Sequence, residues 1–161
     1  MLNKESILLK RLTIEDAEAF HNLYFPKFKQ GRQSEVHIGI DKTPSEFAEF
    51  IASVCNEIFT IRMAANPDII IGDCALHHWN KENYEIEIGG FLLPAYWGKG
   101  IMANAFGHLI CLAREEYNAE TLVAKTEPIN KNALKFAKKM GFDFRTFEEN
   151  KVVLFKRLDE H

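Results

Sequence analysis

The stretch Tyr96–Phe106 reads YWGKGIMANAF and places two glycines around a lysine, immediately before an apolar pattern of helical spacing. It follows YEIEIGGFLL, whose alternating acidic and apolar residues predict a strand over 84–93. A strand that turns through glycines into a helix exposes unpaired backbone amides at the positive end of the helix dipole. Because Gly98 and Gly100 carry no Cβ, phosphate oxygens can approach the main chain, and Lys99 adds positive charge. The stretch therefore predicts a phosphate-binding turn.

The composition is that of an ordinary globular domain, and we expect residues 1–161 to form a single domain. Apolar residues make up 47% of the chain, and no window approaches the roughly 18 uninterrupted apolar residues that a membrane span requires. The formal charge of -3 offers no general attraction for nucleic acid. The first residues lack the apolar segment of a secretory signal. We therefore expect a cytoplasmic protein with neither a membrane nor a nucleic-acid partner.

Apolar periodicity and turn residues predict strands and helices along the whole chain. Strands are expected over 6–12, 59–65, 68–79, 84–93, 121–126, 142–149 and 152–158, and helices over 17–25, from Pro44, over 102–117, and between Asn130 and Gly141. Pro26 is expected to act as a helix breaker. Thr43 and Glu46 are expected to form a capping box around Pro44, Asn130 to cap a later helix, and Gly141 to end that helix in a left-handed conformation. The order β α α β β β α β α β β is typical of an α+β domain with a mixed sheet.

Two other nucleotide-binding motifs are compatible with glycine-rich turns, and neither fits. A P-loop requires glycine and a serine or threonine where this chain has Leu93 and Gly100. The Rossmann spacing G-x-G-x-x-A is present over 98–103, and Glu127 ends the next expected strand. In that fold, however, the strand runs straight into the first glycine, whereas here 94–97 intervene and too little chain follows for a doubly wound sheet.

Two separated segments, IEIGGFLLPAYWGKGIMANAFGHLICLA and INKNALKFAKKMGFDF, resemble the acetyl-CoA-binding core of the GNAT superfamily of N-acetyltransferases. The runs LLPAYWGKG and N-x-x-A-L-x-x-A-x-K-x-GF look like the branch that includes the ribosomal-protein N-terminal acetyltransferases, and LLKRLTIEDAEAF is similar to its opening strand and helix. The resemblance implies acetyl-CoA as cofactor and the GNAT fold, an α+β arrangement in which about four helices flank a twisted, mostly antiparallel mixed sheet of about seven strands.

The resemblance also implies a set of cofactor contacts. The family's loop pattern Q/R-x-x-G-x-G/A falls on 97–102, so that Trp97 takes the first position and Met102 stands where a small residue is usual and could crowd the phosphates. Backbone groups of Gly98, Lys99, Gly100, Ile101, Met102 and Ala103 are expected to contact the diphosphate, and Phe91, Leu92 and Leu93 to pair with the pantetheine arm as an added strand. Asn130 matches a position that touches the cofactor arm, a role compatible with helix capping.

Amide formation from an amine and a thioester needs a neutral amine and a polarised acetyl carbonyl. The resemblance aligns Glu87 with the general base of several family members, and Glu85 points to the same strand face. Both carboxylates are equally compatible with plain ion pairing or with a solvent-facing position. A backbone amide near Leu92 or Leu93 would polarise the carbonyl.

The leaving thiolate needs a proton, and the hydroxyl groups that relatives use are replaced by Ala133 and Ala137. The proton is expected to come from water or from a residue outside the helix that contains these alanines, with Tyr96 and then Tyr24 as the candidates. In the family, the segment after the first helix forms one wall of the acceptor cleft. That wall is expected to contain Tyr24, Phe25, Phe28 and His37.

No metal site is expected from the sequence. His77 and His78 are adjacent in an expected strand near Cys74, and adjacent strand residues point to opposite faces, so that the two imidazoles should not share an ion. The three cysteines are widely spaced and odd in number, unlike a disulfide framework or a paired zinc site.

These expectations describe an N-acetyltransferase that moves acetyl from acetyl-CoA to a primary amine by direct attack in a ternary complex, since no cysteine is placed to carry the acetyl group. The acceptor classes, in order of preference, are a protein or peptide N-terminus, a polyamine or other small amine, and an amino sugar or antibiotic. One alternative is a non-catalytic acyl-CoA-binding or regulatory domain, and another is an interaction domain without affinity for coenzyme A. A homodimer formed through exposed strands or helices is compatible with either reading.

Overall fold

The computed structural model describes residues 6–30 and 41–158, with side chains described up to Tyr24 in the first range. His37 lies outside the described residues. The strands are β1 (Ile7–Arg11), β2 (Cys55–Met63), β3 (Gly72–Asn80), β4 (Glu85–Leu92), β5 (Thr121–Thr126), β6 (Asp143–Glu148) and β7 (Lys151–Arg157). The helices are α1 (Ala17–Gln30), α3 (Pro44–Val54), α4 (Ile101–Tyr117) and α5 (Lys131–Lys139), with short 3-10 turns η1 (Ile14–Asp16) and η2 (Pro94–Tyr96).

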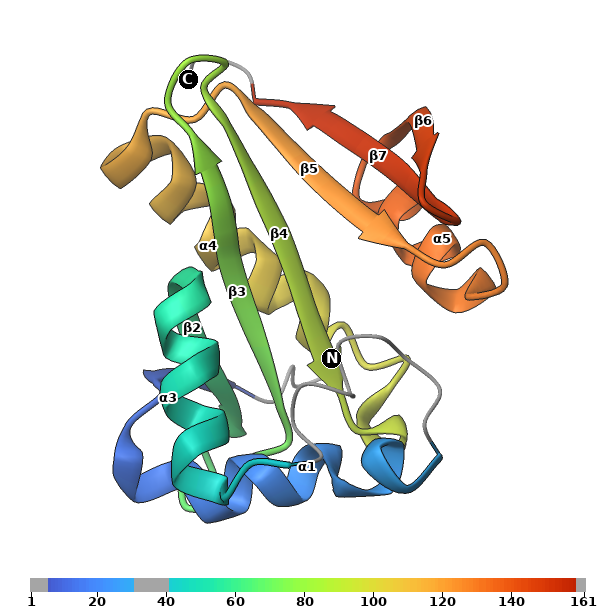
Figure 1. The fold of residues 1–161 in the computed structure, drawn as a ribbon. Helices are drawn as coiled ribbons and strands as arrows, with labels where there is room; N and C mark the ends of the chain where they lie inside the picture. Colours follow the sequence, from blue (N-terminus) through green and yellow to red (C-terminus); the bar gives the residue numbers. More distant parts are fainter. Residues whose placement is uncertain (1–5, 31–40, 159–161) are drawn as a thin grey trace, which may run out of the picture.

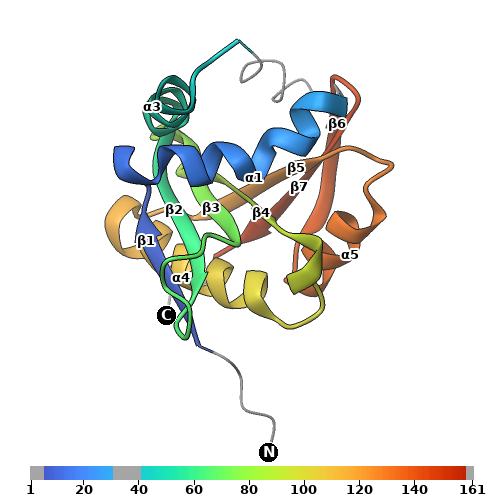
Figure 2. The same ribbon diagram turned by 90° about the horizontal axis from the view of Figure 1, so that it is seen from below.

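All the strands belong to one seven-stranded sheet in the order β1-β2-β3-β4-β5-β7-β6. Every neighbouring pair is antiparallel except β4 and β5, which run parallel. Helices α1 and α3 lie on one face of the sheet and α4 and α5 on the other (Figures 1 and 2). The expected α+β order of elements and the mostly antiparallel sheet are confirmed.

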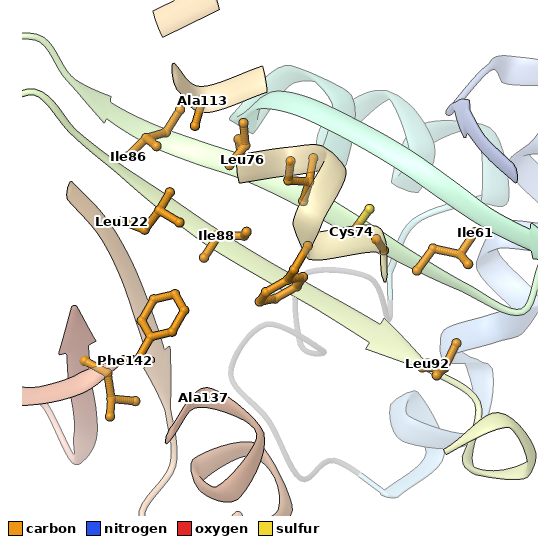
Figure 3. Packing of buried hydrophobic residues seen from close by; sticks show 14 of the residues in the cluster. Ile61, Cys74, Leu76, Ile86, Ile88, Leu92, Ala113, Leu122, Ala137 and Phe142 are labelled. Carbon is orange, nitrogen blue, oxygen red and sulfur yellow. The ribbon is translucent and has the colours of Figure 1, made fainter. Parts of the chain in front are cut away.

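The main apolar core lies between α4 and the sheet. Fully buried side chains of β3, β4 and β5 meet Ala105, Leu109 and Ala113 of α4, as Figure 3 shows for part of the cluster. Ile86 and Ile88 of β4 point into this core, so the alternate positions Glu85 and Glu87 point to the α1 and α3 face. The pattern of β4 thus assigns its acidic residues to one face of the sheet.

Local signals predicted the helix ends better than the strand starts. Thr43 and Glu46 form the expected capping box of α3, the Asn130 side chain caps α5, and Gly141 has φ 91°. By contrast, β2 begins at Cys55 rather than at 59, and β3 begins at Gly72 rather than at 68. Ile70 and Ile71 are buried beside the sheet without belonging to β3, and apolar periodicity alone does not distinguish such residues from a paired strand.

The expected end of the first helix at Phe25 was wrong, because α1 continues through Pro26 to Gln30. A proline removes one backbone hydrogen-bond donor and is disfavoured inside a helix, but it is not excluded there. Pro26 therefore lies within α1 and does not end it. None of the helices among the described residues is both long and apolar enough to span a membrane.

An enclosed ion pair fixes the start of α1 to the sheet. The carboxylate of Asp16 lies 3.0 Å from Nη2 of Arg62 on β2, whose side chain is only 5% exposed. Burial alone would raise the pKa of Asp16, but hydrogen bonds from Arg62 and Thr13 and the charge of Arg62 outweigh it and hold the pKa below its usual value. The pair therefore favours the folded state whenever Asp16 is ionised.

We expect Asp16→Asn to lower the free energy of unfolding by about 2 kcal/mol at pH 7, because it leaves the enclosed Arg62 charge without its counterion. Since the folded-state pKa of Asp16 is depressed, this stabilisation is complete above the unfolded pKa and is lost as pH falls through the folded pKa. Urea titrations across that range should show the variant and the wild type converging. Glu15→Gln, at an exposed neighbour, is the control, and a difference no larger than that of the control would contradict the role of the pair.

Candidate active site

Strands β4 and β5 separate after a short paired stretch. Their register joins only Glu85 with Thr121, Ile86 with Leu122, and Glu87 with Val123, and none of the described residues continues the ladder. Beyond this point β4 stays paired with β3 as far as Leu92, and β5 stays paired with β7 as far as Thr126. The two strands consequently diverge like the arms of a V (Figure 1).

The glycine turn joins the end of β4 to the start of α4, at the open end of this V. Gly98 and Gly100 have φ of 77° and 76°, a left-handed conformation that L side chains rarely adopt. A Cβ added to either glycine would meet no atom within 4 Å, so no neighbouring group of the protein explains the absence of a side chain. The turn leaves open space over both glycines.

The first turn of α4 presents unpaired backbone donors into that space. Its N-cap is Gly100, which has no side chain to accept a hydrogen bond, and the first amide bonded within the helix is that of Asn104, to the Gly100 carbonyl at 3.0 Å. The amides of Ile101, Met102 and Ala103 therefore keep their donors at the positive end of a 17-residue helix. This geometry suits a bound anion.

The Met102 side chain is turned away from the expected phosphate position. Its Sδ and Cε lie 3.1 Å from the point where a Cβ at Gly90 would stand, and the side chain packs against the core cluster. The glycine in β4 thus makes room for the bulky residue that departs from the family pattern. Met102 supplies its backbone to the turn while its side chain packs under the strand.

The other residues expected at the cofactor lie around the same turn or on α5. Trp97 donates its indole N–H to the Leu92 carbonyl at 2.8 Å, which closes the turn against the end of β4. Lys99 is exposed, with Nζ 5.7 Å from the centre of the Tyr96 ring. Asn130 accepts a hydrogen bond from the Ala133 amide at 3.1 Å, so its capping role is established.

Glu87 lies beside the point where β4 and β5 part, and its side chain is 13% exposed. Oε1 of Glu87 is 3.1 Å from Nδ1 of His78 and 3.6 Å from Nζ of Lys125, while Oε2 is 3.4 Å from Nε2 of His77. Three groups able to carry positive charge therefore surround one largely enclosed carboxylate.

The expectation that His77 and His78 face opposite sides of the sheet was wrong. The register of β3 against β4 shifts between His77 and Asn80, and His78 has φ 54°. This bulge turns the His78 side chain back to the face that carries His77, so both rings reach Glu87 and their centres lie 4.8 Å apart. The alternation rule fails here because it assumes a regular strand.

Glu85 has a different partner. Its Oε1 accepts a hydrogen bond of 2.7 Å from Nη2 of Arg145 on β6, and this bond, opposed by burial and aided by the nearby carboxylates, raises the pKa of Arg145. The sequence left open whether each carboxylate is a catalytic base or forms an ion pair. Glu85 forms an ion pair with Arg145, whereas Glu87 lies at the divergence of β4 and β5 and has several partners.

Tyr24 is the acceptor-wall residue whose contacts are described. Its hydroxyl donates a hydrogen bond to the carboxylate of Asp73, which is only 4% exposed, and its ring packs 5.4 Å from that of Phe91. Helix α1 is thereby attached to β3 and β4 on the face that also carries Glu87. Phe25 and Phe28 lie on α1 beyond Tyr24, where the description covers the backbone alone.

Sequence reasoning missed two polar residues of this face, Asp73 and Lys125, and it did not predict that both His77 and His78 contact Glu87. Asp73 could have been noticed as a single acid inside the apolar run IIIGDCAL, and Lys125 as a single cation inside TLVAKT. The Lys125 ammonium bridges Glu87 and Glu148, at 3.6 and 3.3 Å. Burial would lower the pKa of Lys125, but the two carboxylates outweigh it and raise the pKa.

Comparison with known proteins relates this geometry to a family. The sequence profile of the acetyltransferase (GNAT) domain matches residues 6–143. A relative from Bacillus licheniformis, described as an uncharacterized N-acetyltransferase p20, is 33% identical over 75 residues, which cover 47% of this chain and 42% of the relative. The match thus spans less than half of that relative's length.

Several solved structures share the fold. RimL, a ribosomal L7/L12 alpha-N-protein acetyltransferase in complex with coenzyme A, has a TM-score of 0.78 at 13% identity, with 99% of this chain and 97% of that chain covered. The ribosomal-protein-S5-alanine acetyltransferase from Vibrio fischeri has a TM-score of 0.75 at 16% identity, with 99% and 97% covered. The dodecameric spermidine N-acetyltransferase from Vibrio cholerae has a TM-score of 0.69 at 17% identity, with 94% and 93% covered. At these identities the likeness establishes the GNAT fold.

We expect Glu87→Gln to lower the pKa of Lys125, because the variant removes a carboxylate charge 3.6 Å from Nζ while burial of the ammonium remains. The measurement is an NMR titration of the lysine side-chain resonances. Glu85→Gln, which removes a carboxylate paired with Arg145, is the matched control and should leave the Lys125 titration in place. Equal titration curves for wild type and Glu87→Gln would show that the two side chains do not interact in solution.

Proposed function

The chain belongs to the GNAT acetyltransferase domain family, and we propose that it is an acetyl-CoA-dependent N-acetyltransferase that acts on a primary amine. The observation that carries the proposal is the glycine turn. Two left-handed glycines with open space above them stand before three unpaired amides of α4, at the open end of the β4–β5 divergence. A diphosphate held there would direct its attached arm along β4.

The unpaired edge of β4 offers the arm its binding surface. Beyond Glu87, the backbone of β4 has no partner from β5 among the described residues, so amide groups of a pantetheine arm can bond to it as an added strand would. We assign this role to Phe91, Leu92 and Leu93. The thioester would then lie between the diverging strands, within reach of the face that carries Glu87.

We assign Glu87 as the general base. The acceptor arrives mainly as an ammonium ion, and Glu87, directly or through water, takes its proton so that the amine nitrogen can attack the acetyl carbonyl carbon. The carbon–sulfur bond then breaks, the electron pair leaves on the thiolate, and the nitrogen releases its second proton to solvent as the amide forms. Both oxygens of this carboxylate lie at the divergence of β4 and β5, within 3.6 Å of side-chain nitrogens of His77, His78 and Lys125.

We assign Tyr96 as the donor of the proton that the thiolate takes up. Its ring packs at the edge of the core directly after β4, and its hydroxyl makes no hydrogen bond within the described part of the chain. Tyr24 is less suited to this role because it donates its proton to Asp73. Ala133 and Ala137 on α5 leave no other hydroxyl at the positions where relatives carry one.

Direct attack is favoured over an acetylated cysteine intermediate. Burial and, to a smaller extent, the charge of Asp73 raise the pKa of Cys55 to about 11 and that of Cys74 to about 12. Both thiols are therefore protonated and weakly nucleophilic near neutral pH. Cys111 lies on α4, the helix that covers the opposite face of the sheet from Glu87.

The acceptor is expected to be an amine that is cationic before reaction, because Glu87 places a carboxylate beside the divergence on the α1 and α3 face. We propose a protein or peptide N-terminus first and a polyamine or other small amine second, with the wall formed by Tyr24 and the adjoining part of α1, including Phe25 and Phe28. His37 is proposed for the same wall from its sequence position. A thiol-release assay over a panel of N-terminal peptides, polyamines and amino sugars identifies the class.

A non-catalytic acyl-CoA sensor is the competing proposal. It is favoured by Ala133 and Ala137, which remove the usual hydroxyls, and by the bond of Lys125 to Glu87, which engages the proposed base. A sensor would bind acetyl-CoA without releasing thiol on any amine of the panel. Turnover with any acceptor of the panel excludes it.

We expect Gly100→Ala to weaken coenzyme A binding at least tenfold, because a Cβ forces the turn out of its left-handed conformation at a cost of about 1–2 kcal/mol and disturbs the α4 amides. Gly107→Ala, the same substitution inside the same helix at an exposed position, is the matched control. It should raise stability by up to about 1 kcal/mol and leave coenzyme affinity unchanged. Titration calorimetry and thermal shift measure both effects, and equal affinities for the two variants would refute the turn as the diphosphate site.

We expect Glu87→Gln to lower kcat about 100-fold at constant acetyl-CoA affinity, because the amide cannot accept the ammonium proton. Steady-state rates with the best acceptor from the panel provide the measurement, and Glu85→Gln is the control because its ion pair lies away from the divergence. Tyr96→Phe should also lower kcat, by more than Tyr24→Phe does. Unchanged turnover in Glu87→Gln would remove the assignment of the base without affecting the assignment of the cofactor site.

A further inference from the structure

We propose that His77, His78 and Glu87 form a binding site for a divalent transition-metal ion with the ligand preferences of Zn²⁺. One ligand atom from each residue lies within 4.8 Å of the other two. The site stands on the same carboxylate that we propose as general base, so an ion bound there would withhold Glu87 from the acceptor amine. Only this inhibitory consequence rests on the proposed function, because metal binding itself is independent of acetyl transfer.

The spacing of the ligand atoms is already close to that of a coordination sphere. Nδ1 of His78 lies 3.1 Å from Oε1 of Glu87, and Nε2 of His77 lies 3.4 Å from Oε2. Two ligands bound tetrahedrally at about 2.1 Å from one Zn²⁺ ion are about 3.4 Å apart. The three ligand atoms lie within 4.8 Å of one another, so an ion would draw them closer together by side-chain rotation.

The backbone creates this convergence. The bulge of β3 and the positive φ of His78 bring both imidazoles to one face, whereas a regular strand would separate them. A non-glycine residue at positive φ is uncommon and costs conformational energy. The result of that conformation is a pair of imidazoles and a carboxylate, a donor set that suits Zn²⁺ and leaves a fourth position for water or a substrate atom.

The cluster is accessible from one side and supported on the other. His78 is 70% exposed, while His77 and Glu87 are 24% and 13% exposed. Gly89 follows Glu87 by two residues on the same face of β4. A Cβ at Gly89 would lie 3.8 Å from Nε2 of His77, so the glycine leaves free space next to this ligand atom. An ion can enter past His78 and reach two ligands that the sheet holds in place.

Lys125 opposes binding, because its ammonium lies 3.6 Å from Oε1 of Glu87 and repels a second cation. Glu148 offers this ammonium another acceptor at 3.3 Å, so Lys125 can turn toward β6 when an ion occupies the cluster. The Lys125 ammonium thus lowers the affinity of the site for Zn²⁺, so replacing Lys125 by an uncharged residue should raise that affinity. A site formed by adventitious surface histidines would lack that dependence on Lys125.

The test is titration calorimetry of tag-free protein with ZnCl₂ at pH 7.5, without coenzyme. We expect one ion per chain for the wild type, at least tenfold weaker binding for His78→Ala and for Glu87→Gln, and at least threefold tighter binding for Lys125→Met. His108→Ala and Cys111→Ser, at exposed positions of α4, are matched controls for loss of a surface imidazole and of a thiol, and should bind as the wild type does.

Absence of saturable binding by the wild type below about 100 µM Zn²⁺, or affinity in His78→Ala equal to that in His108→Ala, would overturn the proposal. Because His78 is largely exposed, His78→Ala should fold, and urea unfolding of each variant checks this. His78→Gln is the conservative second variant and should also lose affinity for Zn²⁺. Loss of zinc binding in His78→Ala and His78→Gln with retained acetyl transfer would support the metal site. Zinc binding by a wild-type protein that transfers no acetyl group would refute only the proposed function.

Discussion

The divergence of β4 and β5 is the constraint on which the rest of this molecule depends. Two parallel strands that share three paired positions can separate because each retains a full ladder on its other side, β4 with β3 and β5 with β7. The cost of opening is thus limited to the bonds between the two strands themselves. On the core face, helix α4 packs against β3 and β4, so β4 keeps buried contacts on that face where its pairing with β5 ends.

The same divergence brings opposite charges to a single opening from the two faces of the sheet. The amides at the start of α4 offer partial positive charge where β4 ends, while Glu87 offers a carboxylate on the face covered by α1. In the proposed reaction an anionic coenzyme and a cationic amine each meet the charge that suits them. A sheet paired along its whole length would keep these two ligands apart.

The sequence was informative wherever a signal was local. The left-handed Gly141, the Thr43–Glu46 capping box and the Asn130 cap are determined by a few adjacent residues, and all were predicted. The order of elements followed from periodicity for the same reason. The bulge at His78 has no such mark, because it arises from the register between two strands, and the burial of Asp73 beneath Tyr24 needs a contact between residues 49 apart. The glycine turn before α4 could therefore be predicted from the sequence, whereas the partners of Glu87 required the fold.

Glu87 shows why the catalytic residues of such a face are difficult to assign from pattern alone. A carboxylate has two oxygens, and here they contact two imidazoles and an ammonium. Each partner favours a different use of the same group: Lys125 favours a permanent ion pair, an approaching amine favours proton acceptance, and two neutral imidazoles favour a shared metal ion. Burial strengthens all three interactions together, so the occupant with the greatest charge density and the best geometry prevails. Strand β4 fixes where Glu87 lies, and the group that reaches the divergence of β4 and β5 determines which interaction Glu87 makes.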